Sequence, residues 1–306
     1  MNVSRADILV VGESVADVIH RPGGGSVTHP GGSPANVAYG LARLDEDVAL
    51  LTQLGDDEDG ALIRAHLVGA GVRLVAPADP ELPTPRATAR IQADGSAEYD
   101  FEIGWTLADP PPCRAPHVHT GSIAAFLSPG ADTVLDLLEA ARGDASISVD
   151  PNIRAALLGD HEAALARFER LASLADVVKA SDEDLDWLYP GEDPAGIARG
   201  LVETGTGLVI VTRGADGATA MTRAGMTEVA APRTHVADTV GAGDSFMAAL
   251  LASLRRSGLL GPGLRDALAQ TPPELRPHLD QAARAAAITV SRRGANPPTR
   301  DELVGR

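Results

Sequence analysis

The sequence has one cysteine, few aromatic residues and a deficit of basic side chains. Cys113 stands alone in a chain of 306 residues, so an internal disulfide is excluded and a reducing compartment fits. Aromatic residues make up 3% of the chain, so Ala, Val, Leu and Ile have to build the core. Lys and Arg number 26 against 42 Asp and Glu, and the net charge of −16 argues against nucleic acid as a partner. A small phosphorylated ligand remains open, because backbone amides and a metal can hold it.

Long hydrophobic runs are also missing. No apolar run approaches the roughly 18 residues of a membrane span, and residues 1–7 are polar, unlike a signal peptide. We therefore expect no membrane partner and a cytoplasmic protein. Hydrophobic residues make up 44% of the chain, enough for the core of one large α/β domain with a small appendage.

Short apolar runs alternate with amphipathic helical patterns. The expected strands are 8–11, 48–51, 117–120, 147–149, 177–178 and 208–212, and the expected helices are 34–44, 60–67, 131–141, 162–171 and 194–203. This alternation predicts an α/β fold with a mostly parallel central sheet and helices on both faces. Ser33 is expected to cap the helix that starts with Pro34, and Ser181 with Asp184 resembles a capping box.

Two stretches break this alternation. Residues 14–25 end in three glycines, and residues 84–105 alternate around a turn at 93–96, as a hairpin would. They predict a small β lid over a substrate pocket, within one domain that spans residues 1–306. A hairpin that only decorates the surface is the alternative.

The most informative motif runs from Asp238 to Asp244, Asp-Thr-Val-Gly-Ala-Gly-Asp, and a helical apolar stretch follows it. Its two glycines let consecutive N–H groups point outward at the start of a helix, where an anion binds. Asp244 can take a proton from a hydroxyl nucleophile beside that anion. This pairing is what phosphoryl transfer to an alcohol requires, and an ordinary glycine turn capped by Asp244 is the alternative.

Two motifs resemble the signatures of the ribokinase-like (PfkB) carbohydrate kinases. They are Gly31-Gly-Ser-Pro-Ala-Asn-Val-Ala38 and the motif that ends at Asp244, and weaker matches lie in the same order at 55–60, 150–154, 212–217 and 294–298. The resemblance covers essentially the whole chain and implies a ribokinase-like fold and an ATP-dependent sugar kinase. Nothing resembles the loop of a P-loop kinase.

The resemblance also implies residue roles. Asp244 corresponds to the catalytic base, and the amides of Ala242, Gly243 and Asp244, in the turn that starts at Gly241, correspond to the anion hole. The residues expected at the sugar are Asp17, Gly32, Asn36 and Arg154. Those expected at ATP are Lys179, Ser181, Thr212, Gly214, Gly217 and Asn296. Taken alone, Asp17 reads as a surface strand residue, Asn36 as a helix residue and Arg154 equally well as half of a surface ion pair.

Metal ions follow from the same resemblance. Mg²⁺ would accompany ATP, with Asp184 holding it through water, although Ser181 and Asp184 stand where the family often has Asn and Glu. Many members bind K⁺ beside the anion hole, and the matching residues here are Asp238, Val240, Arg292 and Gly294. Pro298 stands where a serine often completes that site. His117 and His119 share one face of a strand but lack further ligands at metal spacing, so we predict a structural role.

The first signature resembles the fructokinase branch, because ribokinases usually have Gly-Gly-Lys-Gly-Ala-Asn there. Fructose is therefore the expected acceptor, and Tyr99, Phe101 and Trp105 would either pack on the sugar or fill the lid's own core. Ribose, 2-keto-3-deoxygluconate and nucleosides remain alternatives, as does a sugar- or nucleotide-binding sensor without turnover. By analogy with the family, a homodimer would form through the lid.

Overall fold

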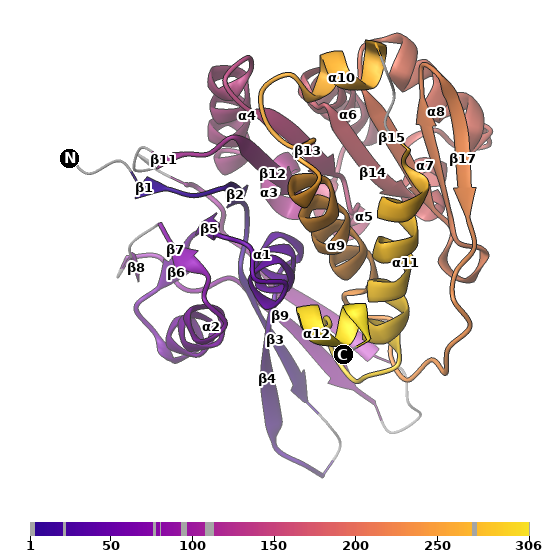
Figure 1. The fold of residues 1–306 in the computed structure, drawn as a ribbon. Helices are drawn as coiled ribbons and strands as arrows, with labels where there is room; N and C mark the ends of the chain where they lie inside the picture. The colour runs from indigo at the N-terminus through magenta and orange to yellow at the C-terminus, as the bar shows by residue number, and fades with distance from the viewer. Residues whose placement is uncertain are drawn as a thin grey trace.

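A nine-stranded sheet forms the centre of the computed structural model, which describes residues 4–20, 23–75, 78–79, 81–92, 97–107, 113–270 and 274–305 (Figure 1). Its strands, in chain order, are β2 (Ile8–Val11), β5 (Val48–Leu51), β7 (Arg73–Leu74), β12 (His117–Gly121), β13 (Ser146–Asp150), β14 (Val177–Ser181), β15 (Leu208–Thr212), β16 (Ala218–Thr222) and β17 (Gly225–Val229). Their order across the sheet is β17-β16-β15-β14-β13-β12-β2-β5-β7. Neighbours are parallel except in the pairs β15–β16 and β16–β17, which are antiparallel.

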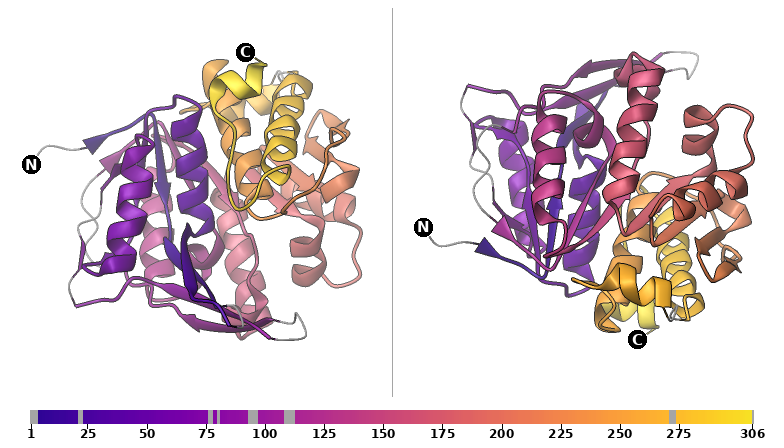
Figure 2. Two further views of the ribbon diagram at one scale, coloured as in Figure 1. Left: turned by 90° about the horizontal axis from the view of Figure 1, so that it is seen from below. Right: turned by 90° about the horizontal axis from the view of Figure 1, so that it is seen from above.

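Helices cover both faces of this sheet (Figure 2). One face packs against α1 (Ser33–Arg43), α2 (Glu58–Gly69), α9 (Ala242–Arg256), α10 (Leu264–Gln270), α11 (Arg276–Val290) and α12 (Arg300–Val304). The other packs against α3 (Ser122–Phe126), α4 (Gly130–Ala141), α6 (His161–Leu174), α7 (Asp182–Leu188) and α8 (Pro194–Glu203). Strand β2 shows why its sequence is continuously apolar: Ile8 and Val10 face the first layer, and Leu9 and Val11 face the second.

A second, four-stranded sheet contains both stretches that break the βα alternation. Its strands are β3 (Val15–His20), β4 (Ser26–Gly31), β9 (Arg86–Ile91) and β10 (Ala97–Glu102), in the order β10-β9-β3-β4. Figure 1 shows β3, β4 and β9 below the main sheet. The hairpin turn expected at 93–96 lies outside the described residues. Two short strand pairs lie outside both sheets: β1 (Ser4–Arg5) with β11 (Cys113–Arg114), and β6 (Leu54–Gly55) with β8 (Ala78–Asp79). The remaining described elements are α5 (Ala155–Leu158) and the 3₁₀ turn η1 (Gly214–Asp216).

The predicted α/β fold with its mostly parallel sheet is confirmed, and one expected side-chain placement is wrong. Trp105 does not lie on the small sheet: it is 2% exposed, packs in the core of the second helix layer, and donates its indole N–H to the Ala124 carbonyl at 3.1 Å. Across the described ranges, no helix has the length and apolar character that a bilayer crossing requires.

Candidate active site

The turn that precedes α9 can be made only with glycine at position 241. Gly241 is the N-cap of the helix and adopts a left-handed conformation with φ +75°. A Cβ atom at this position would lie 2.7 Å from the Cβ of Ala295. Both the backbone conformation and the close neighbour therefore exclude a side chain, and the loop around residue 295 lies directly against the turn.

The first amides of α9 are arranged as an anion-binding site requires. Within the described part of the chain, the N–H groups of Gly243 and Asp244 have no hydrogen-bond acceptor, as is usual for the first turn of a helix. The Ala242 N–H makes only a long bond of 3.3 Å to the Thr239 carbonyl. Because α9 has 15 residues, its dipole adds partial positive charge at this end.

Asp244 lies in the first turn of α9 and is 7% exposed. Ser33 donates its hydroxyl to Oδ1 at 2.6 Å, and Asn36 donates its amide Nδ2 to Oδ2 at 2.8 Å. Burial raises the pKa of Asp244, while the bonds from Ser33 and Asn36 and the charges of Lys179 and Arg154 act to lower it. The site therefore holds a buried carboxylate whose ionised form depends on its hydrogen-bond partners.

Helix α1 supplies both of these partners, but Ser33 does not cap it as the sequence predicts. The N-cap is Gly32, which has φ +96° and makes no side-chain cap hydrogen bond. A Cβ on Gly32 would lie 2.6 Å from the Glu13 carbonyl oxygen, so this backbone contact also requires glycine. Ser33 is the first helical residue, and its hydroxyl is used by Asp244 instead.

Lys179 brings a buried positive charge to the start of α9. Its Nζ lies 2.7 Å from Asp150 Oδ2, with the two side chains 4% and 2% exposed. The same Nζ would be 3.3 Å from a Cβ on Gly243, so the absence of a side chain there makes room for the ammonium group. Burial opposes the charge on Lys179, but Asp150, Asp184 and Asp244 outweigh it and raise its pKa. Lys179 is therefore a cation beside the free amides of α9.

Arg154 is close enough to both Asp17 and Asp244 to act on them through its charge. The Arg154 guanidinium is exposed and donates to Asn152 Oδ1 at 2.7 Å, within its own loop. Its charge nevertheless acts on the carboxyl groups of both Asp17 and Asp244. Burial raises the pKa of Asp17 to about 6, and its carboxylate occupies the space where Gly31 lacks a side chain.

Glu13 is a buried acid that the sequence does not single out. It lies two residues beyond β2, is 1% exposed, and accepts the Ala124 N–H on Oε2 at 2.9 Å. Its Oε1 atom has no hydrogen-bond partner among the described residues. Burial raises the pKa of Glu13 to about 7, against smaller opposing effects that include the charge of Arg154. The sequence signal that could have identified Glu13 is its position just after a buried strand, because ligands bind at that edge of parallel sheets.

The residues expected at ATP follow the neighbouring strands β14 and β15. Ser181 and Thr212 end these strands and are paired in register. Gly214 begins the 3₁₀ turn, and Gly217 has φ +87° with the Val229 carbonyl 2.1 Å from a would-be Cβ. The structure thus brings these four residues to one edge of the sheet. Asn296 lies on a different segment, the loop that contacts the Gly241 turn.

The residues near Asp184 can be tested against a magnesium ion. Asp184 accepts the Ile153 N–H on Oδ1 at 2.7 Å and the Ser181 N–H on Oδ2 at 2.9 Å, which completes the predicted capping box. Asp150 Oδ1 is buried and has no hydrogen-bond partner in the described ranges. A carboxylate oxygen with free lone pairs suits Mg²⁺, which usually takes one or two carboxylates together with water and phosphates. Asp150 fits the ion better than the expected Asp184.

The segments expected at potassium are joined by Asp238. Its carboxylate accepts the Val240 N–H at 3.1 Å and the Gly294 N–H at 2.9 Å. These bonds hold the pKa of Asp238 below its usual value. Arg292 lies two residues before Gly294, so the structure brings the four expected residues into one region.

His117 and His119 are structural, as predicted. His117 bonds to the hydroxyls of Ser146 and Ser148 at 2.7 and 2.9 Å, and His119 bonds to Ser148 at 2.9 Å. Burial lowers the pKa of both histidines to about 3, so they are neutral. The described segments contain no group of three or more His, Cys, Asp or Glu side chains able to hold a metal ion.

Together these groups can carry out one type of chemistry. A buried carboxylate stands in the first turn of a helix whose free N–H groups, with a nearby lysine, favour an anion. A hydroxyl group placed between them can lose its proton to Asp244 while it attacks a phosphoryl group held at the helix end.

Comparisons with known proteins agree with this geometry. A family model described as "pfkB family carbohydrate kinase" matches residues 5–302. A fructokinase of Rhizobium leguminosarum bv. trifolii is 35% identical over 267 residues, which cover 83% of this chain and 81% of that protein. A fructokinase structure from Xylella fastidiosa with bound ATP has a TM-score of 0.83 at 25% identity, covering 98% of each chain. A double mutant of a Vibrio cholerae fructokinase, solved with fructose, ADP and a potassium ion, has a TM-score of 0.78 at 25% identity and covers 99% of this chain and 98% of that one.

Proposed function

The chain belongs to the pfkB family of carbohydrate kinases, and from this premise we propose that it transfers the γ-phosphoryl group of ATP to a hydroxyl group of fructose. One observation carries the proposal: Asp244, held by Ser33 and Asn36, stands in the first turn of α9 beside amides that lack acceptors. A general base and an anion site are thereby adjacent, as transfer to an alcohol requires.

In the proposed reaction, Asp244 accepts the proton of the attacking sugar hydroxyl. The sugar oxygen forms a bond to the γ-phosphorus while the bond from phosphorus to the β–γ bridging oxygen breaks, and ADP leaves with that electron pair. The N–H groups of Gly243 and Asp244 stabilise the negative charge on the transferred group, with help from Lys179. The proton then passes from Asp244 to solvent.

The sugar is proposed to lie between Asp244 and the small sheet. Asp17 on β3 and Asn36 on α1 offer hydrogen-bonding groups, and Gly32 lets the sugar approach the backbone. Arg154 acts on the carboxyls at both ends of this space and would face the transferring phosphoryl group. The four-stranded sheet would serve as the lid of this pocket, and its edge strands β10 and β4 would pair in a homodimer.

Fructose is supported by the first signature and by relatives that carry the name fructokinase. The residues proposed to contact ATP are Lys179, Ser181, Thr212, Gly214, Gly217 and Asn296. When bound, Mg²⁺ would neutralise charge on its phosphates, held by Asp150 and, through water, by Asp184. We also propose a potassium ion at Asp238, with carbonyl groups of Val240, Arg292 and Gly294 as its further ligands.

Acceptor-dependent ADP release tests this function. The reaction contains ATP and magnesium, with fructose, glucose, ribose, 2-keto-3-deoxygluconate, adenosine or water as acceptor, each with and without potassium. We expect stimulation by fructose above all other acceptors, and faster turnover with potassium. Preference for ribose, 2-keto-3-deoxygluconate or adenosine would contradict the fructose assignment. ATP binding without stimulation by any of these acceptors would contradict the fructose assignment and indicate either an acceptor outside this panel or a sensor.

A further inference from the structure

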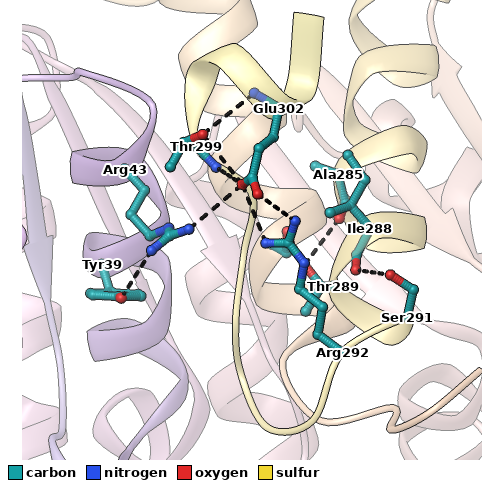
Figure 3. Close-up of polar contacts among 10 residues, drawn as sticks. Tyr39, Arg43, Ala285, Ile288, Thr289, Ser291, Arg292, Thr299 and Glu302 are labelled. Carbon is teal, nitrogen blue, oxygen red and sulfur yellow. Dashed lines mark hydrogen bonds and ion pairs between the residues drawn. The ribbon is translucent and has the colours of Figure 1, made fainter. Parts of the chain in front are cut away.

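Glu302, near the end of the chain, joins three segments through one carboxylate (Figure 3). The Arg292 guanidinium donates to Oε1 at 2.7 Å and to Oε2 at 3.3 Å. The Thr299 backbone N–H donates to Oε2 at 2.8 Å, and an Arg43 nitrogen lies 3.7 Å from the same oxygen. We call these four residues the Glu302 clasp.

The clasp closes the two ends of the loop formed by residues 293–298. Arg292 stands immediately before this loop and Thr299 immediately after it, and both are bound to Glu302. Within the loop, the Gly294 N–H is held by Asp238. The loop is therefore fixed at both ends, and near its first end by a second contact.

This loop lies against the anion-binding turn. A Cβ on Gly241 would be 2.7 Å from the Cβ and 2.9 Å from the Cα of Ala295, so the two backbones are in close contact. Pro297 lies near Gly40 of α1, where a Cβ would be 3.7 Å from its ring. A shift of the loop would consequently displace the start of α9, where Gly243 and Asp244 present their free N–H groups.

The clasp also reaches α1, which supplies the partners of Asp244. Arg43 lies in the last turn of this helix, and its guanidinium is further supported by Tyr39, whose ring centre is 5.7 Å away and whose hydroxyl accepts from Nη1 at 3.4 Å. Figure 3 shows Arg43 extending from α1 toward Glu302 and Arg292. Glu302 thus connects α1, which supplies both partners of Asp244, with the loop that contacts the Gly241 turn.

The charge of the clasp is stable. The Arg292 guanidinium and the Thr299 N–H lower the pKa of Glu302 to about 2, so the carboxylate is ionised near neutral pH. A two-point contact between a guanidinium and a carboxylate fixes direction as well as distance, unlike a single surface ion pair.

We propose that Glu302 is a positioning residue for the nucleotide side of the active site, which holds the 293–298 loop against the Gly241 turn. This inference rests on the proposed function in one respect, namely that the phosphates of ATP bind at that turn. Without the charge of Glu302, the loop would lose the fixed position of its first end, and the turn would lose its support.

The test compares Glu302→Gln with Glu139→Gln. Glutamine at position 302 keeps the contact with Thr299, since either Glu or Gln completes a capping box, and removes only the charge that binds the two arginines. Glu139 is a matched control, because it also pairs with an arginine, Arg170, and its side chain is 42% exposed against 41% for Glu302. Calorimetry with a non-hydrolysable ATP analogue and hydrogen exchange of the amides of residues 293–296 are measured on both proteins and on the wild type; Pro297 and Pro298 have no amide hydrogen.

For Glu302→Gln we expect the dissociation constant of the analogue and the KM for ATP to rise by about three- to tenfold. The KM for fructose should change by less than about twofold. The amides of residues 293–296 should exchange faster, and Glu139→Gln should match the wild type. Arg292→Gln should reproduce the loss, and the double variant should be no worse than either single one. Unchanged analogue binding in Glu302→Gln, or an equal loss in Glu139→Gln, would overturn the inference. A wild-type protein that binds the analogue but does not phosphorylate fructose contradicts only the assignment of fructose as the acceptor. The ratio of the analogue's dissociation constants in Glu302→Gln and the wild type still decides the role of the clasp.

Discussion

Ser33 and Asp244, which are 211 positions apart in the chain, are joined by a buried hydrogen bond of 2.6 Å between hydroxyl and carboxylate. Ser33 opens α1 and Asp244 lies in the first turn of α9, so the bond links the N-terminal ends of two packed helices. A hydroxyl that donates to a carboxylate stabilises its charged form. Ser33 therefore helps keep the proposed base ionised in surroundings that favour the neutral acid.

Replacing Ser33 with Ala should make turnover more sensitive to acid. The bond from Ser33 lowers the pKa of Asp244, so its loss raises that pKa and leaves more of the base protonated at a given pH. We expect kcat at pH 6 to fall by about tenfold, with a smaller loss at pH 8.5. The pH profile of kcat measures this change.

Ser33→Thr keeps the hydroxyl and serves as the control. The acidic limb of its pH profile of kcat should stay close to that of the wild type. An equal loss of kcat at every pH in Ser33→Ala would show that the serine does not act through the ionisation of Asp244.

Glu13 should make the protein less stable as the pH rises. Its pKa is raised from 4.5 to about 7 in the folded protein, so between these values the folded state holds a proton that the unfolded state has released. The free energy of unfolding therefore falls with rising pH across this window, by on the order of 3 kcal/mol for this group, and levels off above it. Urea unfolding at pH 5, 6, 7 and 8 measures the slope.

Glu13→Gln removes this contribution while Asp17, Asp150 and Asp244, whose pKa values are also raised, remain in both proteins. The difference between the wild type and the variant should thus shift in favour of the variant from pH 5 to pH 8. A difference that does not depend on pH would show that Glu13 is ionised throughout.

Lys179→Met should destabilise the fold strongly, because it leaves Asp150 buried without its cation. We expect a loss of about 3–5 kcal/mol at pH 8. The loss should be smaller at pH 5, where Asp150, whose pKa burial already raises to about 6, can take up a proton. Urea unfolding at the two pH values measures both numbers.

The double variant Asp150→Asn with Lys179→Met tests the reason for that loss. It should recover most of the stability, since no unpaired charge remains, yet it should still be a poor kinase without the cation beside α9. If the double variant is as unstable as Lys179→Met, the cause is packing and not the buried charge.

The main sheet could be predicted because its sequence signal is local. Strand β2 is apolar at every position since both of its faces are covered, and this continuous run is visible without knowledge of its neighbours. The end of α6 was harder to predict: the helix continues to Leu174, three residues beyond the expected limit. Leu171, Ala172 and Leu174 are buried there, and this packing extends the helix.

Without the family resemblance, the site could be predicted only where consecutive residues form it. The turn from Gly241 to Asp244 is such a case, because its amides and its carboxylate come from one motif. Ser33 shows the opposite case: serine before proline is a usual helix start, but the cap falls on Gly32, and the partner of Ser33 lies in a distant helix. Glu13 and the Glu302 clasp depend in the same way on contacts between segments that the chain order does not bring together.

The measurement that tests the account most directly is turnover by Asp244→Asn, with binding measured on the same preparation. Asparagine has nearly the same shape but cannot accept the proton, so kcat for fructose phosphorylation should fall by about 10²–10⁴-fold. Calorimetry should show the dissociation constants of fructose and an ATP analogue nearly unchanged. A variant that retains kcat within about tenfold of the wild type would contradict the assignment of Asp244 as the base.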